Sequence, residues 1–123
     1  MTDRDRILLK KIYLNQKLLF DTVKELHISA PADLDSIHSM MRRGMVQTVA
    51  DIFELTVPIG EDVLKQLPLN IAIIKQFRNT ASHNYGQITS ALAYACIIHC
   101  VDKQFMSVVE KLLDMDDDTR DNR

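Results

Sequence analysis

Four side chains that can move protons or bind phosphate lie close together in the second half of the chain. They are a guanidinium, an amide, an imidazole and a phenol, carried by Arg78, Asn79, His83 and Tyr85. An imidazole exchanges protons near neutral pH, and a guanidinium binds phosphate oxygens through paired N–H donors. The segment therefore has the groups needed for acid–base chemistry on a phosphate ester.

Cleavage of RNA without a metal fits this set. His83 would take the proton of a ribose 2′-hydroxyl or protonate the leaving 5′-oxygen, and Arg78 would stabilise the charge that develops on the phosphate. Asn79 would orient the imidazole or donate to a phosphate oxygen. A purely structural alternative remains open from the residues alone, in which the arginine makes a salt bridge, the histidine caps a helix and the tyrosine packs.

Helical geometry limits which of these groups can cooperate. Asn79 and His83 are four residues apart and share a helix face. Arg78 and His83 are five apart and diverge by about 140° on an ideal helix. For these two side chains to converge, the helix must loosen near His83, or one of them must come from a second subunit.

The segments around this cluster predict an all-α fold. Only three glycines and three prolines interrupt the chain, and apolar residues recur every three or four positions. We expect helices over about residues 4–26, 34–56 and 69–82, a turn or two at 61–66, and a last helix from Thr89 or Ser90 to about residue 112. Asp33 or Asp35 would cap the second helix, and Gly44 within it indicates close packing against a neighbouring helix. The expected order of helices describes one up-and-down helical bundle over residues 1–113, with three long helices, a motif helix and a short connecting turn. Residues 114–123 are acidic and have no apolar pattern, so we expect a disordered tail.

The charge distribution allows a local RNA site. The net charge is −2, but the last ten residues hold five aspartates and two arginines, which leaves 12 acidic and 13 basic residues in the body. Arg42 and Arg43 either extend an RNA-binding surface or lie on a solvated helix face. We expect no membrane span and no secretion signal, and hence a cytoplasmic protein.

The remaining candidate ligands do not form a metal site. Cys96 and Cys100 are one helical turn apart and are expected to be buried thiols rather than a disulfide. His27, His38 and His99 are isolated and are expected at the surface or at helix ends. We therefore predict no metal and no cofactor.

The string Arg78-Asn79-x-x-x-His83-x-Tyr85, preceded by a helix and followed by a long helix, resembles the Arg-x-x-x-x-His-x-Tyr signature of HEPN-domain proteins. The order of elements over about residues 5–113 is similar to that of the HepT-like toxins within this group. The resemblance implies a HEPN-type bundle and an endoribonuclease toxin that acts as a homodimer. By matched position, Arg78 and His83 would be the catalytic pair and Asn79 their support.

The same resemblance implies a partner and a means of control. HepT-like toxins are paired with a minimal nucleotidyltransferase antitoxin, which transfers AMP to the motif tyrosine, here Tyr85. AMP at Tyr85 would place bulk and negative charge where the RNA phosphate binds. Asp51 and Glu54, near the end of the second helix, are assigned no catalytic role. The alternative function is a non-catalytic HEPN-type module that binds a nucleotidyltransferase.

Overall fold

The all-α prediction is confirmed over residues 1–121, which are the residues that the computed structural model describes. These residues contain no strand. They form α1 (Asp3–Glu25), α2 (Asp33–Ser36), α3 (Ser39–Thr56), α4 (Glu61–Leu64), α5 (Ile71–His83), the 3₁₀ turn η1 (Tyr85–Gln87), α6 (Ser90–Cys100) and α7 (Lys103–Asp121).

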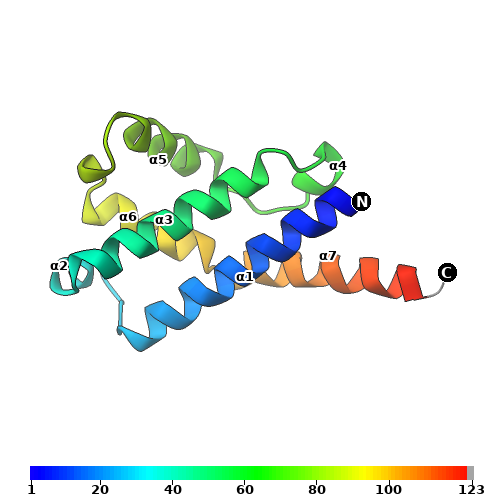
Figure 1. Cartoon of the computed structure of the whole chain (residues 1–123), viewed down its shortest axis with the longest axis horizontal. Coiled ribbons are helices and arrows are strands. Elements are labelled where there is room, and N and C mark those ends of the chain that lie inside the picture. The colour runs from blue at the N-terminus through cyan, green and yellow to red at the C-terminus, as the bar shows by residue number, and fades with distance from the viewer. Residues whose placement is uncertain (122–123) are drawn as a thin grey trace.

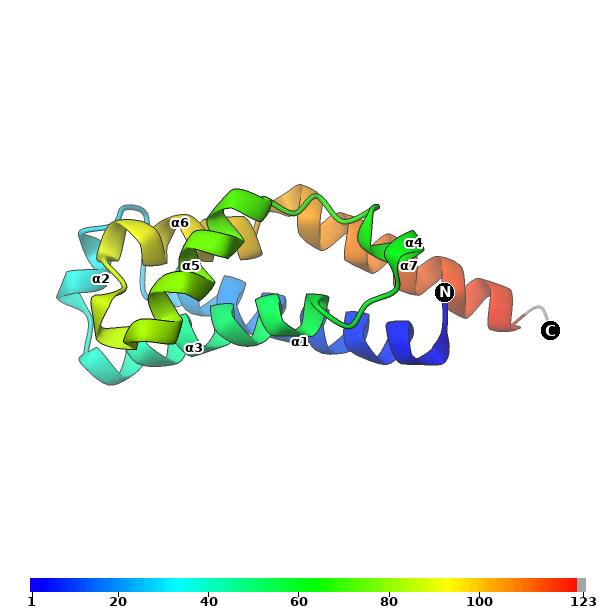
Figure 2. The same ribbon diagram turned by 90° about the horizontal axis from the view of Figure 1, so that it is seen from above.

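The long helices pack in two layers. α1 and α3 lie side by side and run in opposite directions, and α6 and α7 follow one another behind them (Figures 1 and 2). α5 lies beside α3 and α6 at one half of the bundle, and η1 joins it to α6. The motif helix therefore lies along one edge of the two layers, with only Ile74 and Phe77 of α5 buried.

The core forms between the apolar faces of these helices. Leu9, Ile12 and Leu19 of α1 are fully buried, at positions that the sequence periodicity places on one face. Gln16 lies in the same row, and its Nε2 donates to the backbone oxygen of Cys100 at 3.0 Å. This bond ties the middle of α1 to the end of α6.

The start of α1 is fixed to the loop before α4. Thr2 and Asp5 form a capping box, in which each side chain accepts a hydrogen bond from the other residue's backbone N–H. The buried Asp5 carboxylate also accepts the Gly60 N–H at 2.9 Å, and this bond is the largest cause that lowers the pKa of Asp5.

The helix predicted over residues 34–56 is two helices. The chain is extended at Ile37, and α3 begins after His38, whose Nδ1 accepts the Met40 N–H at 3.1 Å. Neither predicted aspartate caps α3. Asp33 accepts the backbone N–H groups of Ser29 and Ala30, which tightens the preceding turn.

Gly44 does not mark a close helix contact in the chain. It is exposed on α3, and a Cβ atom at this position would meet nothing within 4 Å. The expectation of close packing at Gly44 was therefore wrong.

The last predicted helix is also interrupted. α6 ends at Cys100, and Asp102 caps α7 by accepting the N–H groups of Gln104 and Phe105 at 3.0 and 3.2 Å. The sequence from Ser90 to Met115 is long and apolar enough to cross a membrane by composition, contrary to our expectation. Its buried residues, including Cys96 and Phe105, belong to the core of the bundle, which is sufficient reason for their hydropathy.

α7 continues as far as Asp121 and so includes most of the acidic segment after Leu113. The disordered tail over residues 114–123 stays a prediction. Residues 122–123 lie outside the described part.

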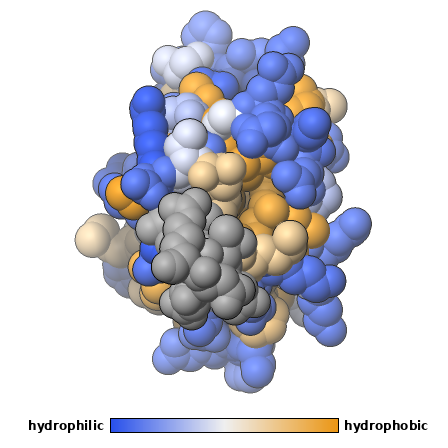
Figure 3. All heavy atoms as spheres, turned by 90° about the vertical axis from the view of Figure 1, so that its right-hand side faces the viewer, coloured by the Kyte–Doolittle hydropathy of each residue, from blue (hydrophilic) through white to orange (hydrophobic). Residues whose placement is uncertain are grey.

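At the end of the bundle where both termini lie, most of the visible surface is hydrophilic, with an apolar patch near its middle (Figure 3).

Candidate functional site

The four motif residues lie at the end of α5 and in the turn that follows. α5 begins after Asn70, whose side chain accepts the Ile73 N–H. Helical geometry continues through His83, and the chain then becomes extended at Asn84, with φ −171° and ψ 121°. The Asn84 side chain accepts the Gly86 N–H at 2.8 Å, which forms the turn that carries Tyr85.

A pocket of about 670 Å³ lies between α3 and α5, with Tyr85 at one side. We call it the motif pocket. Arg78, Asn79 and Tyr85 all line it, so the structure brings three of the four predicted residues to one cavity. The wall from α3 includes Glu54, and Lys75 of α5 adds a second basic group.

Arg78 is held by Glu54 of the neighbouring helix. Its Nε lies 3.2 Å from the Glu54 Oε1, and the side chains remain 48% and 62% exposed. Beneath this pair the rings of Phe53 and Phe77 meet edge to face, with centroids 5.5 Å apart. The aromatic contact joins α3 to α5, and the ion pair directs the Arg78 guanidinium toward α3.

Sequence analysis assigned no catalytic role to Glu54, and no sequence signal joins it to Arg78. The two residues are 24 positions apart on different helices, so only the packing of α3 against α5 shows the pair. Asp51, the other acidic residue considered, accepts a hydrogen bond from Gln47 one turn away on α3 and does not line the motif pocket.

His83 lies outside the motif pocket. It is exposed at the last position of α5, on the face that also presents Ala72, Gln76 and Asn79. The helix does not loosen before His83, because the Asn84 N–H still bonds to the Thr80 oxygen at 3.1 Å. Of the two ways to bring Arg78 and His83 together, loosening of the helix is excluded in this chain. Asn79 lies between two faces of α5, the face of Arg78 that borders the motif pocket and the face that carries His83.

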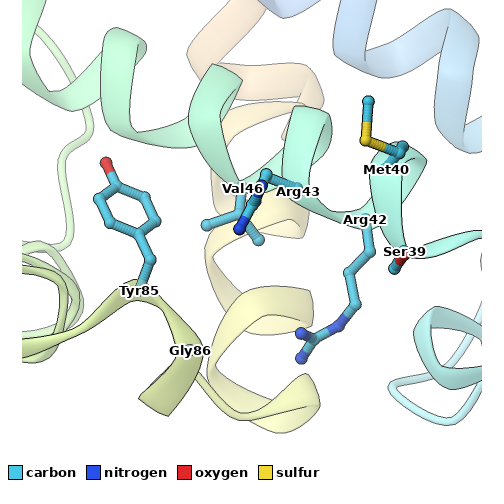
Figure 4. A pocket seen from close by; sticks show the side chains of 7 residues that line it. All are labelled: Ser39, Met40, Arg42, Arg43, Val46, Tyr85 and Gly86. Atoms are coloured by element: carbon cyan, nitrogen blue, oxygen red, sulfur yellow. The ribbon is translucent and has the colours of Figure 1, made fainter.

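Tyr85 is 43% exposed and separates two cavities. One is the motif pocket, and the other, of about 300 Å³, lies against the first turns of α3 (Figure 4). The phenol ring extends from η1 toward α3. A group attached to its hydroxyl would therefore lie between α3 and the motif turn.

His99 supports the start of the motif helix, which sequence reasoning missed. Its Nε2 accepts the backbone N–H of Asn70 at 3.2 Å, and its ring lies between Phe53 and Phe105. Burial lowers the pKa of His99, an effect partly opposed by the nearby Asp102. Sequence analysis treated His99 as an isolated surface or helix-end residue, and it could not show this bond because Asn70 belongs to another helix.

The two arginines of α3 have different surroundings. Arg42 is half-buried, and its guanidinium donates to the Ile88 oxygen and the Ser90 hydroxyl at 3.1 and 3.2 Å. Arg42 therefore has a structural role at the start of α6. Arg43 is exposed and makes no ion pair within the part of the chain that the structure describes.

Both cysteines are free and buried, as predicted. Burial raises the pKa of Cys96 to about 12 and that of Cys100 well above its ordinary value, so neither is an activated nucleophile. Among residues 1–115, whose side chains the structure describes, no three His, Cys, Asp or Glu side chains are grouped closely enough to hold a metal ion.

The chain matches no protein family model, no curated protein sequence and no solved structure.

Proposed function

We propose that this chain is a HEPN-type ribonuclease toxin of the HepT-like kind, which cleaves RNA without a metal and acts as a homodimer. The observation that carries the proposal is the motif pocket, where Arg78, Asn79 and Tyr85 meet. Lys75 and Arg78 line it against the single carboxylate of Glu54, so the lining is net basic in a chain of net charge −2. Such a local basic site suits a phosphate ester.

The proposed reaction needs one proton acceptor and one proton donor. The ribose 2′-oxygen attacks the adjacent phosphorus as His83 takes its proton, and the 5′-oxygen leaves with a proton from water, which gives a cyclic 2′,3′-phosphate and a 5′-hydroxyl end. Arg78 stabilises the charge on the phosphate, and Asn79 orients the imidazole or the phosphate. The 2′-oxygen is the nucleophile, so a 2′-deoxy linkage is not cut.

A second copy of the chain resolves the separation of Arg78 and His83. α1 presents an exposed row with the alternating three- and four-residue spacing of a helix–helix seam. Its apolar members Ile7, Leu14 and Leu18 are 54%, 67% and 60% exposed, and Lys11 and Asp21 lie in the same row. We call this row the α1 seam.

The α1 seam is complementary to itself when two copies run antiparallel. Leu14 then lies opposite Leu18 of the second copy, and Lys11 lies opposite Asp21, twice each by symmetry. The groove beside the seam is lined by Leu14 and Glu54, and Glu54 also lines the motif pocket. A second copy seated there would border the motif pocket.

Mixing two inactive variants tests the composite site. Arg78→Ala and His83→Ala proteins are each expected to cut no RNA in EDTA while retaining their helical content. If the site combines Arg78 of one copy with His83 of the other, one of the two sites in each mixed dimer is intact. Mixed dimers make up about half of all dimers after subunit exchange, so about a quarter of the parent activity returns. No recovery in proteins shown to exchange subunits would contradict the composite site.

Control by a minimal nucleotidyltransferase antitoxin completes the proposal. The Tyr85 hydroxyl would attack the α-phosphate of ATP on that enzyme, with release of pyrophosphate and formation of an adenylyl ester. The exposed ring between two cavities suits such a modification. We expect mass spectrometry of the co-expressed pair to find AMP on Tyr85, and the modified protein to cut no RNA. A Tyr85→Phe protein would stay active beside the transferase.

Two observations favour the alternative of a non-catalytic binding module. His83 is outside the motif pocket, and Arg78 is already paired with Glu54. In that case the purified protein would cut no RNA yet bind the nucleotidyltransferase, and Arg78→Ala or Tyr85→Ala would weaken that complex.

A further inference from the structure

The second cavity beside Tyr85 is chemically different from the motif pocket. It measures about 300 Å³ and lies between the first turns of α3 and the turn that carries Tyr85. Figure 4 shows Met40, Arg42 and Arg43 on the α3 side, with the Tyr85 ring and Gly86 opposite. We call this cavity the side pocket.

The side pocket carries positive charge with no carboxylate in its lining. Arg42 donates to the Ile88 oxygen and the Ser90 hydroxyl, and that hydroxyl in turn donates to the Asp35 carboxylate, which lies outside the side pocket. Arg43 makes no ion pair within the described residues and is exposed to a ligand. Two cations in one small cavity, in a chain of net charge −2, favour an anion.

The other walls of the side pocket are apolar or aromatic. Met40 is 68% exposed, and Tyr85 offers the face or edge of its ring. An aromatic ring near a guanidinium is the combination that binds a nucleotide of single-stranded RNA, with the base against the ring and the phosphate on the arginine. Sugars and simple anions would use only part of this lining.

We propose that the side pocket binds the nucleotide next to the scissile linkage, with its phosphate at Arg43 and its base against the Tyr85 ring. Tyr85 is a wall shared by both pockets, so an RNA strand bound in the motif pocket reaches the side pocket by passing this ring. The inference rests on the proposed ribonuclease function and specifies its substrate as a single strand of at least three nucleotides.

Short substrates with one cleavable linkage test the subsite. A dinucleotide contains only the scissile phosphate, whereas a trinucleotide extended on its 5′ or 3′ side through a 2′-deoxy linkage adds one flanking phosphate. We expect Arg43→Gln to lower kcat/KM on one of the two trinucleotides by about tenfold or more, the effect of one charge-assisted hydrogen bond. Activity on the dinucleotide should stay within about twofold of the parent.

Lys65→Gln is the matched control, because it removes the same charge from an exposed residue that lines neither pocket. Unmodified protein is used throughout, so that an adenylyl group on Tyr85 cannot occupy the side pocket. An equal loss on the dinucleotide and both trinucleotides, or no loss on any of them, would overturn the proposal.

Binding separates a failure of the side pocket from a failure of the ribonuclease proposal. An all-deoxy trinucleotide cannot be cut, and its binding is followed by NMR on the backbone N–H groups of Ser39, Arg43 and Gly86. If the parent cuts no RNA but these signals shift, and do so less in Arg43→Gln, the side pocket stands and catalysis fails. If they do not shift at concentrations that move the Arg78 and Asn79 signals, the side pocket is not a nucleotide site.

Discussion

The Glu54 carboxylate and the Arg78 guanidinium face one another across the motif pocket, 3.2 Å apart and both partly in solvent. A pair this exposed contributes less than about 1 kcal/mol to folding. In the proposed ribonuclease its main effect would fall on the ligand, because Glu54 would compete with an RNA phosphate for Arg78 and repel that phosphate. In the proposed ribonuclease, the affinity of Arg78 for the substrate phosphate therefore depends on this pair.

Glu54→Gln should lower KM for RNA several-fold, with a change in the free energy of unfolding of less than about 1 kcal/mol. Asp51→Asn is the matched control, since it removes the same charge one turn earlier on α3 from a residue bonded to Gln47. Steady-state kinetics and chemical denaturation give the two quantities. Equal changes in KM for both variants would mean that net charge, rather than the contact with Arg78, controls binding.

Charge reversal in the α1 seam should control dimer formation. Lys11→Glu places two carboxylates opposite each other across the antiparallel seam, and Asp21→Lys places two ammonium groups there. We expect each single variant to weaken the dimer and the double variant to restore it, as measured by sedimentation equilibrium. A double variant as monomeric as the singles would rule out this antiparallel register.

The stability of the fold should fall in mild acid because of His99. Burial lowers the pKa of His99 in the folded chain, so the unfolded chain takes up the proton first as the pH falls below about 6.5. The contribution of neutral His99 to the free energy of unfolding is complete above that pH and is lost progressively toward pH 5. Protonation also removes the acceptor for the Asn70 N–H, so the start of α5 should fray first.

His99→Gln should remove this acid sensitivity, because its amide oxygen can still accept a hydrogen bond but does not titrate. The free energy of unfolding, measured by denaturant titration between pH 7 and pH 5, should then vary less than in the parent. His83→Gln is the control, as His83 is exposed and contacts no core residue. An unchanged pH dependence in His99→Gln would assign the effect to another group.

The glycines of α3 and of the following loop should respond oppositely to alanine. Gly44→Ala should raise the free energy of unfolding by about 1 kcal/mol, because the position is exposed, helical and open. Gly60→Ala should lower it, since the new Cβ would lie 3.2 Å from the buried Asp5 carboxylate and 3.0 Å from the Asp62 side chain. Destabilisation by Gly44→Ala would indicate that a second surface approaches α3 there.

Much of the helical order follows from local patterns. α1, α4 and α5 lie within one or two residues of their predicted bounds, because apolar spacing and the residues Pro58, Gly60 and Pro68 mark them. The break at His38 was missed because histidine is not among the common N-cap residues. The break at Asp102 was missed because one aspartate on an apolar helix is also compatible with a solvated position.

Some features of the candidate site likewise follow from local sequence patterns, and others do not. The divergence of Arg78 and His83 follows from the period of one helix, and the regular end of α5 agrees with it. Contacts between helices have no local signature. The bonds of Glu54 to Arg78, Arg42 to Ile88 and His99 to Asn70 depend on how α3, α5 and α6 pack.

The packing of α1 against α7 has a consequence for biosynthesis. Tyr13 of α1 hydrogen-bonds to Glu110, and burial followed by this bond raises the pKa of the Tyr13 phenol. α1 packs against the neighbouring α3 and also against α7, which lies far along the chain, and contacts so distant in sequence form late. A nascent chain that stops before Phe105 has α3 and α6 but lacks α7, so part of the apolar face of α1 has no cover. If the chain is the nuclease proposed above, its fold would be complete only after α7 has left the ribosome.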